Sequence, residues 1–188
     1  MRILSTLILA VTISTSNFVY AEKVEGARGT AHGYGSDHVF SLKAPTGWIV
    51  DTESGAQSRI GLVFYPVGKA WGNSETRMYA QAVPKSANIQ TIDQLVKFTL
   101  SDLHTHGSPN SKAKSVASHQ LSDDRIAKVV FYSGDQWGNF EAVGYIDEQD
   151  AINIFVLNAR NRDAFDAALP VFYEILESYK FTSLRWFQ

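Results

Sequence analysis

The chain contains no cysteine, no strong excess of charge and no apolar run as long as a membrane span. Without cysteine it can form no disulfide, thiol nucleophile, redox pair or cysteine-ligated zinc site, and it cannot carry the lipid of a lipoprotein. A net charge of −2 gives no electrostatic basis for binding nucleic acid. Neither Gly-x-Ser-x-Gly nor His-Glu-x-x-His occurs, so serine hydrolases and zinc proteases have no local support.

The N-terminus is typical of an export signal. Arg2 supplies a positive start, residues 3–13 are almost wholly apolar, and Val19 and Ala21 place small residues at the −3 and −1 positions of a cleavage site. A transmembrane helix needs about 20 apolar residues, so we expect cleavage rather than a membrane anchor. The sequence therefore predicts a signal peptide over residues 1–21 and a soluble mature protein, free of the membrane, in the periplasm or outside the cell.

The rest of the chain predicts one domain. Residues 22–37 are polar and contain four glycines, which predicts a flexible lead-in. Residues 38–188 show no internal repeat, no low-complexity tract and no break in composition. A domain of this size buries roughly 70% of the surface of its unfolded chain, so it can fold without disulfides.

Apolar runs with strand-like alternation predict a largely antiparallel sheet. We expect early strands over residues 38–43, 48–50, 60–65 and 77–83. Later strands are expected over residues 115–122, 126–133, 140–147 and 151–158. The connections between these later strands are too short for a parallel crossover, so they form a meander.

Two helices are expected. Residues 91–94 spell a capping box, and Gly107 followed by Pro109 ends the helix that begins there. The second helix has Asn161 as its cap, a wide apolar stripe, and Pro170 inside it, which predicts a kink or a break. Residues 181–187 either add an edge strand or dock. The elements together predict the α+β class.

Several features of this pattern carry a family resemblance. They are the strand and corner over residues 40–48, the helix beginning at Thr91, the meander from 126 to 158 and the final helix ending at residues 178–181. Over residues 38–182 the pattern resembles the PsbP-like superfamily, which includes a Ran-binding nuclear import factor and bacterial envelope proteins. The resemblance implies an α/β/α sandwich, an antiparallel sheet with helices on both faces, and mostly non-enzymatic roles. No functional residue set transfers position by position.

Two tryptophans in expected loops are the candidate binding residues. Trp71 and Trp137 each stand directly before a Gly-Asn pair. Exposed tryptophans are common anchors of binding surfaces. The alternative is that both indoles fold back and complete the core, because tryptophan is highly buried on average. We hypothesise a partner-binding or ligand-binding site, without catalytic residues, metal or cofactor, formed by Trp71, Asn73, Tyr132, Asp135, Trp137 and Asn139.

Three other groups have simpler interpretations. The two histidines of residues 104–106 point apart on a helix and have no third ligand nearby. Residues 111–114 spell Ser-x-x-Lys, but in a polar loop and without a Lys-Thr-Gly partner. The carboxylates of residues 147–150 are expected to be solvated turn charges rather than a calcium site.

Two classes of function follow. The first is an exported accessory protein that binds a protein partner in the envelope, or a ligand, without catalysis; an immunity protein that neutralises a toxin is a variant of it. The second is a small exported hydrolase whose histidine and carboxylate are dispersed in the sequence. A cleft in which a histidine meets a carboxylate and a hydroxyl would favour the hydrolase. Exposed tryptophans would favour the binding protein.

Overall fold

The computed structural model describes residues 24–25, 29–35, 37–58 and 60–183. The predicted signal peptide, residues 1–21, lies outside the described residues. The helices are α1 (Ile92–Thr105) and α2 (Arg162–Glu177). The strands are β1 (Val24–Glu25), β2 (Thr30–Tyr34), β3 (His38–Lys43), β4 (Trp48–Asp51), β5 (Leu62–Pro66), β6 (Thr76–Pro84), β7 (Lys112–Ser115), β8 (His119–Gln120), β9 (Ile126–Ser133), β10 (Phe140–Asp147), β11 (Ala151–Ala159) and β12 (Lys180–Ser183).

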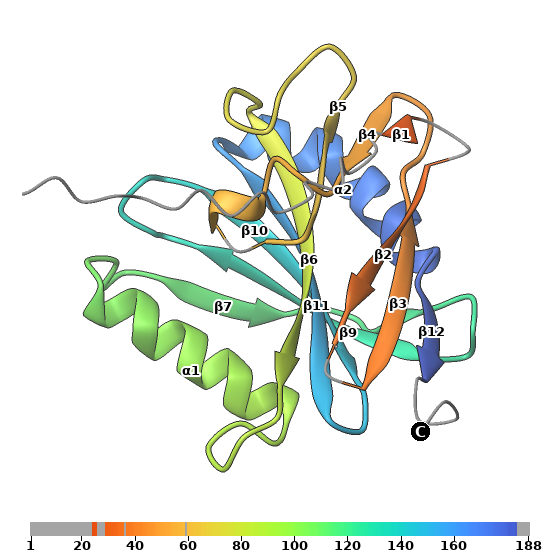
Figure 1. Cartoon of the computed structure of the whole chain (residues 1–188). Helices are drawn as coiled ribbons and strands as arrows, with labels where there is room; N and C mark the ends of the chain where they lie inside the picture. The colour runs from red at the N-terminus through yellow and green to blue at the C-terminus, as the bar shows by residue number, and fades with distance from the viewer. Residues whose placement is uncertain (1–23, 26–28, 36, 59, 184–188) are drawn as a thin grey trace, which may run out of the picture.

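One large antiparallel sheet forms the centre of the molecule. Its strand order is β1-β4-β5-β6-β11-β10-β9-β7, and β8 also pairs with β9. The predicted meander is confirmed, because β9, β10 and β11 pair in sequence order. A smaller sheet, in the order β12-β3-β2, packs with α2 against one face, and α1 lies on the other (Figure 1). The predicted α+β class with helices on both faces is therefore confirmed.

Alternation along the strands divides the apolar residues between the two faces. In β10, Ala142 and Ile146 belong to the core under α2, whereas Val143 and Tyr145 belong to the core under α1. Gly144 lies where α2 crosses the sheet, and a Cβ atom there would come within 2.9 Å of a Leu176 methyl carbon. The missing side chain lets α2 approach the strand closely.

The two helices are packed to different extents. Five residues of α2 are buried, but Leu95 is the only buried residue of α1, and Phe98 on the same helix is 56% exposed. The predicted capping box is present, because Thr91 accepts from the Gln94 backbone and the Gln94 side chain accepts from the Thr91 backbone. Within the described residues, neither helix is long and apolar enough to cross a membrane. Because Leu95 is the only buried residue of α1, the face of the sheet under this helix is only partly covered.

The segment expected as a flexible lead-in contains strand β2. Residues 30–34 pair with β3 in register, and the Ala31 side chain is buried. Gly33 is required here by packing, because a Cβ atom would lie 2.2 Å from the Phe40 ring. The glycines that suggested flexibility instead make room for an aromatic ring, so the prediction is wrong for β2.

Two further predictions differ from the structure, and one open alternative is decided by it. The expected strand over residues 115–122 is two short strands, β7 and β8, which pair separately with β9. Helix α2 continues through Pro170 without a break, since Pro170 is exposed and water can solvate the Asp166 carbonyl that it leaves unpaired. The chain after α2 adds β12 as an edge strand on β3.

A buried polar network links β3, β11 and the end of α2. Asn153 Oδ1 accepts from His38 Nε2 at 3.1 Å, and Asn153 Nδ2 donates to the Tyr179 hydroxyl at 2.7 Å. Tyr179 donates to Glu148 at 2.8 Å, and Arg125 Nε donates to the same carboxylate at 2.8 Å. Glu148 is only 9% exposed, so its interpretation as a solvated turn charge is wrong. We call these five residues the His38–Glu148 network.

Candidate binding cleft

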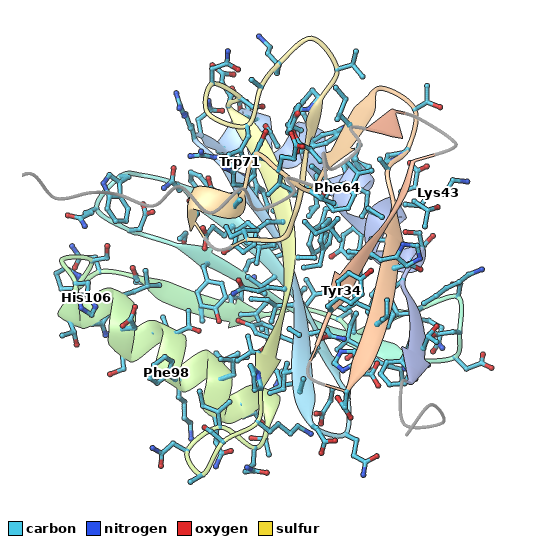
Figure 2. All side chains as sticks on the ribbon, viewed as in Figure 1. Tyr34, Lys43, Phe64, Trp71, Phe98 and His106 are labelled. Carbon is cyan, nitrogen blue, oxygen red and sulfur yellow. The ribbon has the colours of Figure 1, made fainter. Side chains whose placement is uncertain are left out.

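A cleft of about 660 Å³ lies on the α1 side of the large sheet, near the beginning of β6. Strand β6 supplies Arg77 and Tyr79, and β11 supplies Asn158 at the position paired with Arg77. We call this hollow the tryptophan cleft; it is lined by Trp71, Arg77, Tyr79, Trp137, Asn139, Asn158 and Arg160. Figure 2 shows Trp71 toward one end of the sheet and Phe98, on α1, toward the other.

Trp71 forms a fixed wall of the cleft. The Arg77 guanidinium lies 5.3 Å from the centre of the Trp71 ring, and the Tyr79 ring meets it edge-on at 6.4 Å. Asn73 holds the loop by accepting from the Ala70 backbone at 2.8 Å. Trp71 is therefore half-buried and positioned by cation–π and aromatic contacts before any ligand arrives.

Trp137 is exposed on a well-ordered loop. Its side chain is 68% exposed, so the interpretation of both indoles as core residues is wrong for Trp137. Asp135 Oδ1 accepts from the backbones of Trp137 at 3.1 Å and Asn139 at 2.8 Å. Asp135 Oδ2 accepts from Asn139 Nδ2 at 2.8 Å. These bonds fix the turn and present the indole to the cleft.

Two arginines give the cleft its positive charge. Neither Arg77 nor Arg160 forms an ion pair with a carboxylate among the described residues. Besides its contact with the Trp71 ring, the Arg77 guanidinium donates to the Trp71 backbone oxygen at 3.5 Å. Guanidinium groups bind carboxylates and phosphates through paired hydrogen bonds, so both groups remain able to bind an anion.

A smaller hollow of about 180 Å³ opens beside Trp137 and shares Trp137, Asn139 and Asn158 with the tryptophan cleft. We call it the polar chamber; its lining residues are Leu103, Ser111, Tyr132, Ser133, Asp135, Trp137, Asn139, Glu141 and Asn158. Ser111 is 6% exposed, and its hydroxyl has no hydrogen-bond partner within the described part of the chain. A buried hydroxyl without a partner is costly, which makes this chamber unusual.

Glu141 is a half-buried acid that lines the polar chamber together with Asp135. Burial raises the pKa of its carboxyl, a hydrogen bond from Asn158 Nδ2 at 2.6 Å lowers it, and the charge of Asp135 raises it again. Burial prevails, so the pKa lies above the usual glutamate value.

A third hollow, of about 340 Å³, lies between α1 and the sheet. It shares Tyr79 with the tryptophan cleft, and Tyr132 and Glu141 with the polar chamber. The Tyr132 and Tyr145 hydroxyls meet at 2.6 Å along its wall, while most of its other lining is aliphatic. The three hollows adjoin, so the polar cleft leads toward an apolar space beneath α1.

The structure brings together most of the predicted site residues. Trp71, Trp137 and Asn139 line the tryptophan cleft, and Tyr132 and Asp135 line the polar chamber. Asn73 lines neither and acts by holding the Trp71 loop. Sequence patterns could not select several other lining residues, because these stand at ordinary strand positions or strand ends: Arg77, Tyr79, Glu141, Asn158 and Arg160.

The arrangement that would favour a hydrolase is not found in the described part of this site. No histidine lines the tryptophan cleft or the polar chamber. His38 is buried in the His38–Glu148 network, and His104 Nε2 bonds the Ser111 backbone oxygen at 2.9 Å. Among the described residues, no three histidine or acidic side chains gather where they could hold a metal ion.

Comparison with known proteins finds similar solved structures but no match by sequence. No protein-family model and no curated protein matches the chain. A mutant of the protein Mog1 matches with a TM-score of 0.50 at 12% identity, covering 89% of this chain and 99% of its own. The fold is thus similar to that of Mog1, as the predicted superfamily resemblance requires.

Two other solved structures are similar at a lower score. Cyanobacterial PsbP from Synechocystis sp. PCC 6803 matches with a TM-score of 0.47 at 12% identity, covering 92% of this chain and 98% of its own. The Ran-binding protein Mog1p of Saccharomyces cerevisiae matches with a TM-score of 0.47 at 13% identity, covering 87% and 95%.

Proposed function

We propose that this protein is an exported accessory protein that captures a partner or ligand in the tryptophan cleft, without catalysis. The observation that carries the proposal is the meeting of Trp71 and Trp137, from loops far apart in the sequence, in one cleft. Aromatic side chains offer a large contact area at low entropic cost. The two arginines beside them form no ion pair among the described residues, which favours a binding partner that presents an acidic group.

We further propose that the protein acts in the periplasm or outside the cell. The support is the sequence of residues 1–21, with its positive start, apolar stretch and small residues before the cleavage point. When the full chain is expressed in a bacterial host, we expect a mature form that begins at Glu22. Mass spectrometry of the periplasmic fraction or medium checks this. An intact N-terminus retained in the cytoplasm would contradict it.

The double variant Trp71→Ala/Trp137→Ala is expected to keep the fold and to bind its partner about tenfold more weakly or worse, because it removes both aromatic walls of the cleft. The measurement compares immobilised wild type and variant in capture from the envelope fraction, followed by titration of the captured partner. Circular dichroism and thermal unfolding report on the fold.

Tyr34→Ala is the matched control for this experiment. Tyr34 is an aromatic residue of β2 that is 72% exposed and lies outside the tryptophan cleft. Its loss should leave capture unchanged. If the double variant captures the partner as well as wild type does, the cleft is not the binding site. If the double variant unfolds, the indoles serve the fold.

A further inference from the structure

The tryptophan cleft and the polar chamber differ from an ordinary apolar pocket in the side chains that line them. Leu103 is the only aliphatic residue among the described residues that line either hollow. The rest are aromatic, cationic, amide, hydroxyl or carboxyl side chains. A hydrocarbon chain would therefore lose the hydration of these polar groups without gaining aliphatic contacts. The lining suits a ligand that is itself polar at its edges.

The aromatic residue between the two hollows suits a flat ring. Trp137 lines both hollows and is held with its indole exposed by the Asp135 bonds. A pyranose ring has one face lined by C–H groups, which can pack on an indole, and hydroxyl groups around its edge. Tryptophan supplies a large apolar surface for such a face. A ring lying on Trp137 would place its edge toward the polar chamber.

The polar chamber supplies the hydrogen bonds that ring hydroxyls need. A hydroxyl both donates and accepts, so it needs neighbours of both kinds. Ser111 provides a buried hydroxyl with no hydrogen-bond partner among the described residues, and Asn139 and Glu141 provide amide and carboxyl groups within the same 180 Å³ hollow. A ligand hydroxyl bonded to Ser111 would remove the cost of leaving it unpaired.

The arginines of the tryptophan cleft favour a ligand that carries negative charge. Arg77 and Arg160 line the tryptophan cleft, which adjoins the chamber, and neither pairs with a carboxylate among the described residues. We infer that the ligand captured by the cleft is a saccharide that carries an acidic group, with its ring on Trp137, its hydroxyls in the polar chamber and its acid on the arginines. This inference rests on the proposed function, since it names the class of ligand for the same cleft.

Three matched probes test the inference on the mature protein. Digalacturonate carries the sugar rings, the hydroxyls and the acidic groups. Its dimethyl ester keeps the rings and hydroxyls but lacks the negative charge. The dipeptide Glu-Glu carries negative charge without a sugar ring. We expect saturable binding of digalacturonate, at least about tenfold tighter than either of the others, corresponding to about 1.4 kcal/mol. Isothermal titration gives the affinities, and the Trp137 indole N–H shift in NMR spectra places the ligand.

Two variants assign the parts of the ligand. Ser111→Ala is expected to weaken digalacturonate binding several-fold without lowering the unfolding temperature, because in the free protein it removes an unpaired buried hydroxyl. Ser115→Ala, at an exposed position of β7, is the control for this variant. It should change neither the affinity for digalacturonate nor the unfolding temperature. Arg77→Gln combined with Arg160→Gln is expected to remove the preference for the acid over the ester.

Each contrary result contradicts a specific part of the inference about the ligand. If the dimethyl ester binds as tightly as digalacturonate, the ligand does not need an acidic group. If Glu-Glu binds as tightly as digalacturonate, the ligand does not need a saccharide ring. Absence of digalacturonate binding overturns the inference as a whole. If the double tryptophan variant still loses partner capture in that case, the proposed function stands and only the class of ligand is wrong. If capture is also unaffected, both are wrong.

Discussion

Replacing Asn153 by leucine is expected to lower the free energy of unfolding by about 3 kcal/mol, because it breaks the centre of the His38–Glu148 network. Asn153 is buried, and its amide bonds both the His38 ring and the Tyr179 hydroxyl. Leucine has the same branched shape and is larger than asparagine, so the loss would not come from a cavity. The loss arises because His38 Nε2 is left as a buried donor without an acceptor.

Urea unfolding followed by circular dichroism measures this effect. Asn88→Leu, at an exposed asparagine in the loop before α1, is the control and should change the free energy of unfolding by no more than about 0.5 kcal/mol. Buried polar groups are not always stabilising relative to apolar replacements. A variant as stable as wild type would show that this network does not contribute to stability.

The second large effect is expected at Asp51. Replacing it by alanine should lower the free energy of unfolding by about 3 kcal/mol at neutral pH. Asp51 is fully buried, and its carboxylate accepts from the Tyr65 hydroxyl and the Ser54 hydroxyl, both at 2.6 Å. It also accepts from the Glu53 and Ser54 backbones at 2.8 and 3.0 Å. Removal of the carboxylate leaves the buried Tyr65 hydroxyl without this acceptor.

The lowered pKa of Asp51 determines how the stability of the protein changes with pH. Burial opposes ionisation of Asp51, but the hydrogen bonds from Ser54, Tyr65 and Glu53 outweigh burial and lower its pKa from 3.8 to about 2. Because the folded-state pKa is lower than the unfolded one, the stabilisation is present above about pH 4 and is lost as the pH falls toward 2.

The stability difference between wild type and Asp51→Ala should therefore narrow over that interval. Urea unfolding at pH 7, 4 and 2.5 measures it. Asn88→Leu, which changes no ionisable group, serves as the control and should show no such narrowing. A difference that is constant from pH 7 to pH 2.5 would mean that ionised Asp51 is not the source of the stabilisation.

Local patterns predicted the elements that depend on local interactions. The capping box at residues 91–94 is present as expected, because its two hydrogen bonds join residues three apart. The meander is present because its short connections allow only antiparallel pairing. The glycines before β3 misled for the opposite reason, since Gly33 is needed by a ring, that of Phe40, from a neighbouring strand.

The candidate site shows the same division. Trp71 and Trp137 stood out in the sequence because each precedes a Gly-Asn pair in an expected loop. Arg77 and Asn158 did not, because their importance depends on β6 pairing with β11 in a register that sets these two residues side by side. Ser111 was noticed for a motif that it does not serve, whereas its buried, unpaired hydroxyl became visible only in the folded chain.

The sequence by itself determined the class of the fold, its two helices, its meander and the two tryptophans worth testing, because periodicity, caps and turn residues act over a few positions. Only the tertiary structure decided that β2 belongs to a second sheet, that Glu148 is buried, and that the tryptophans share one cleft with two arginines that form no ion pair among the described residues. The physical reason is that strand pairing and burial join residues distant in the chain, and no local pattern encodes the partner.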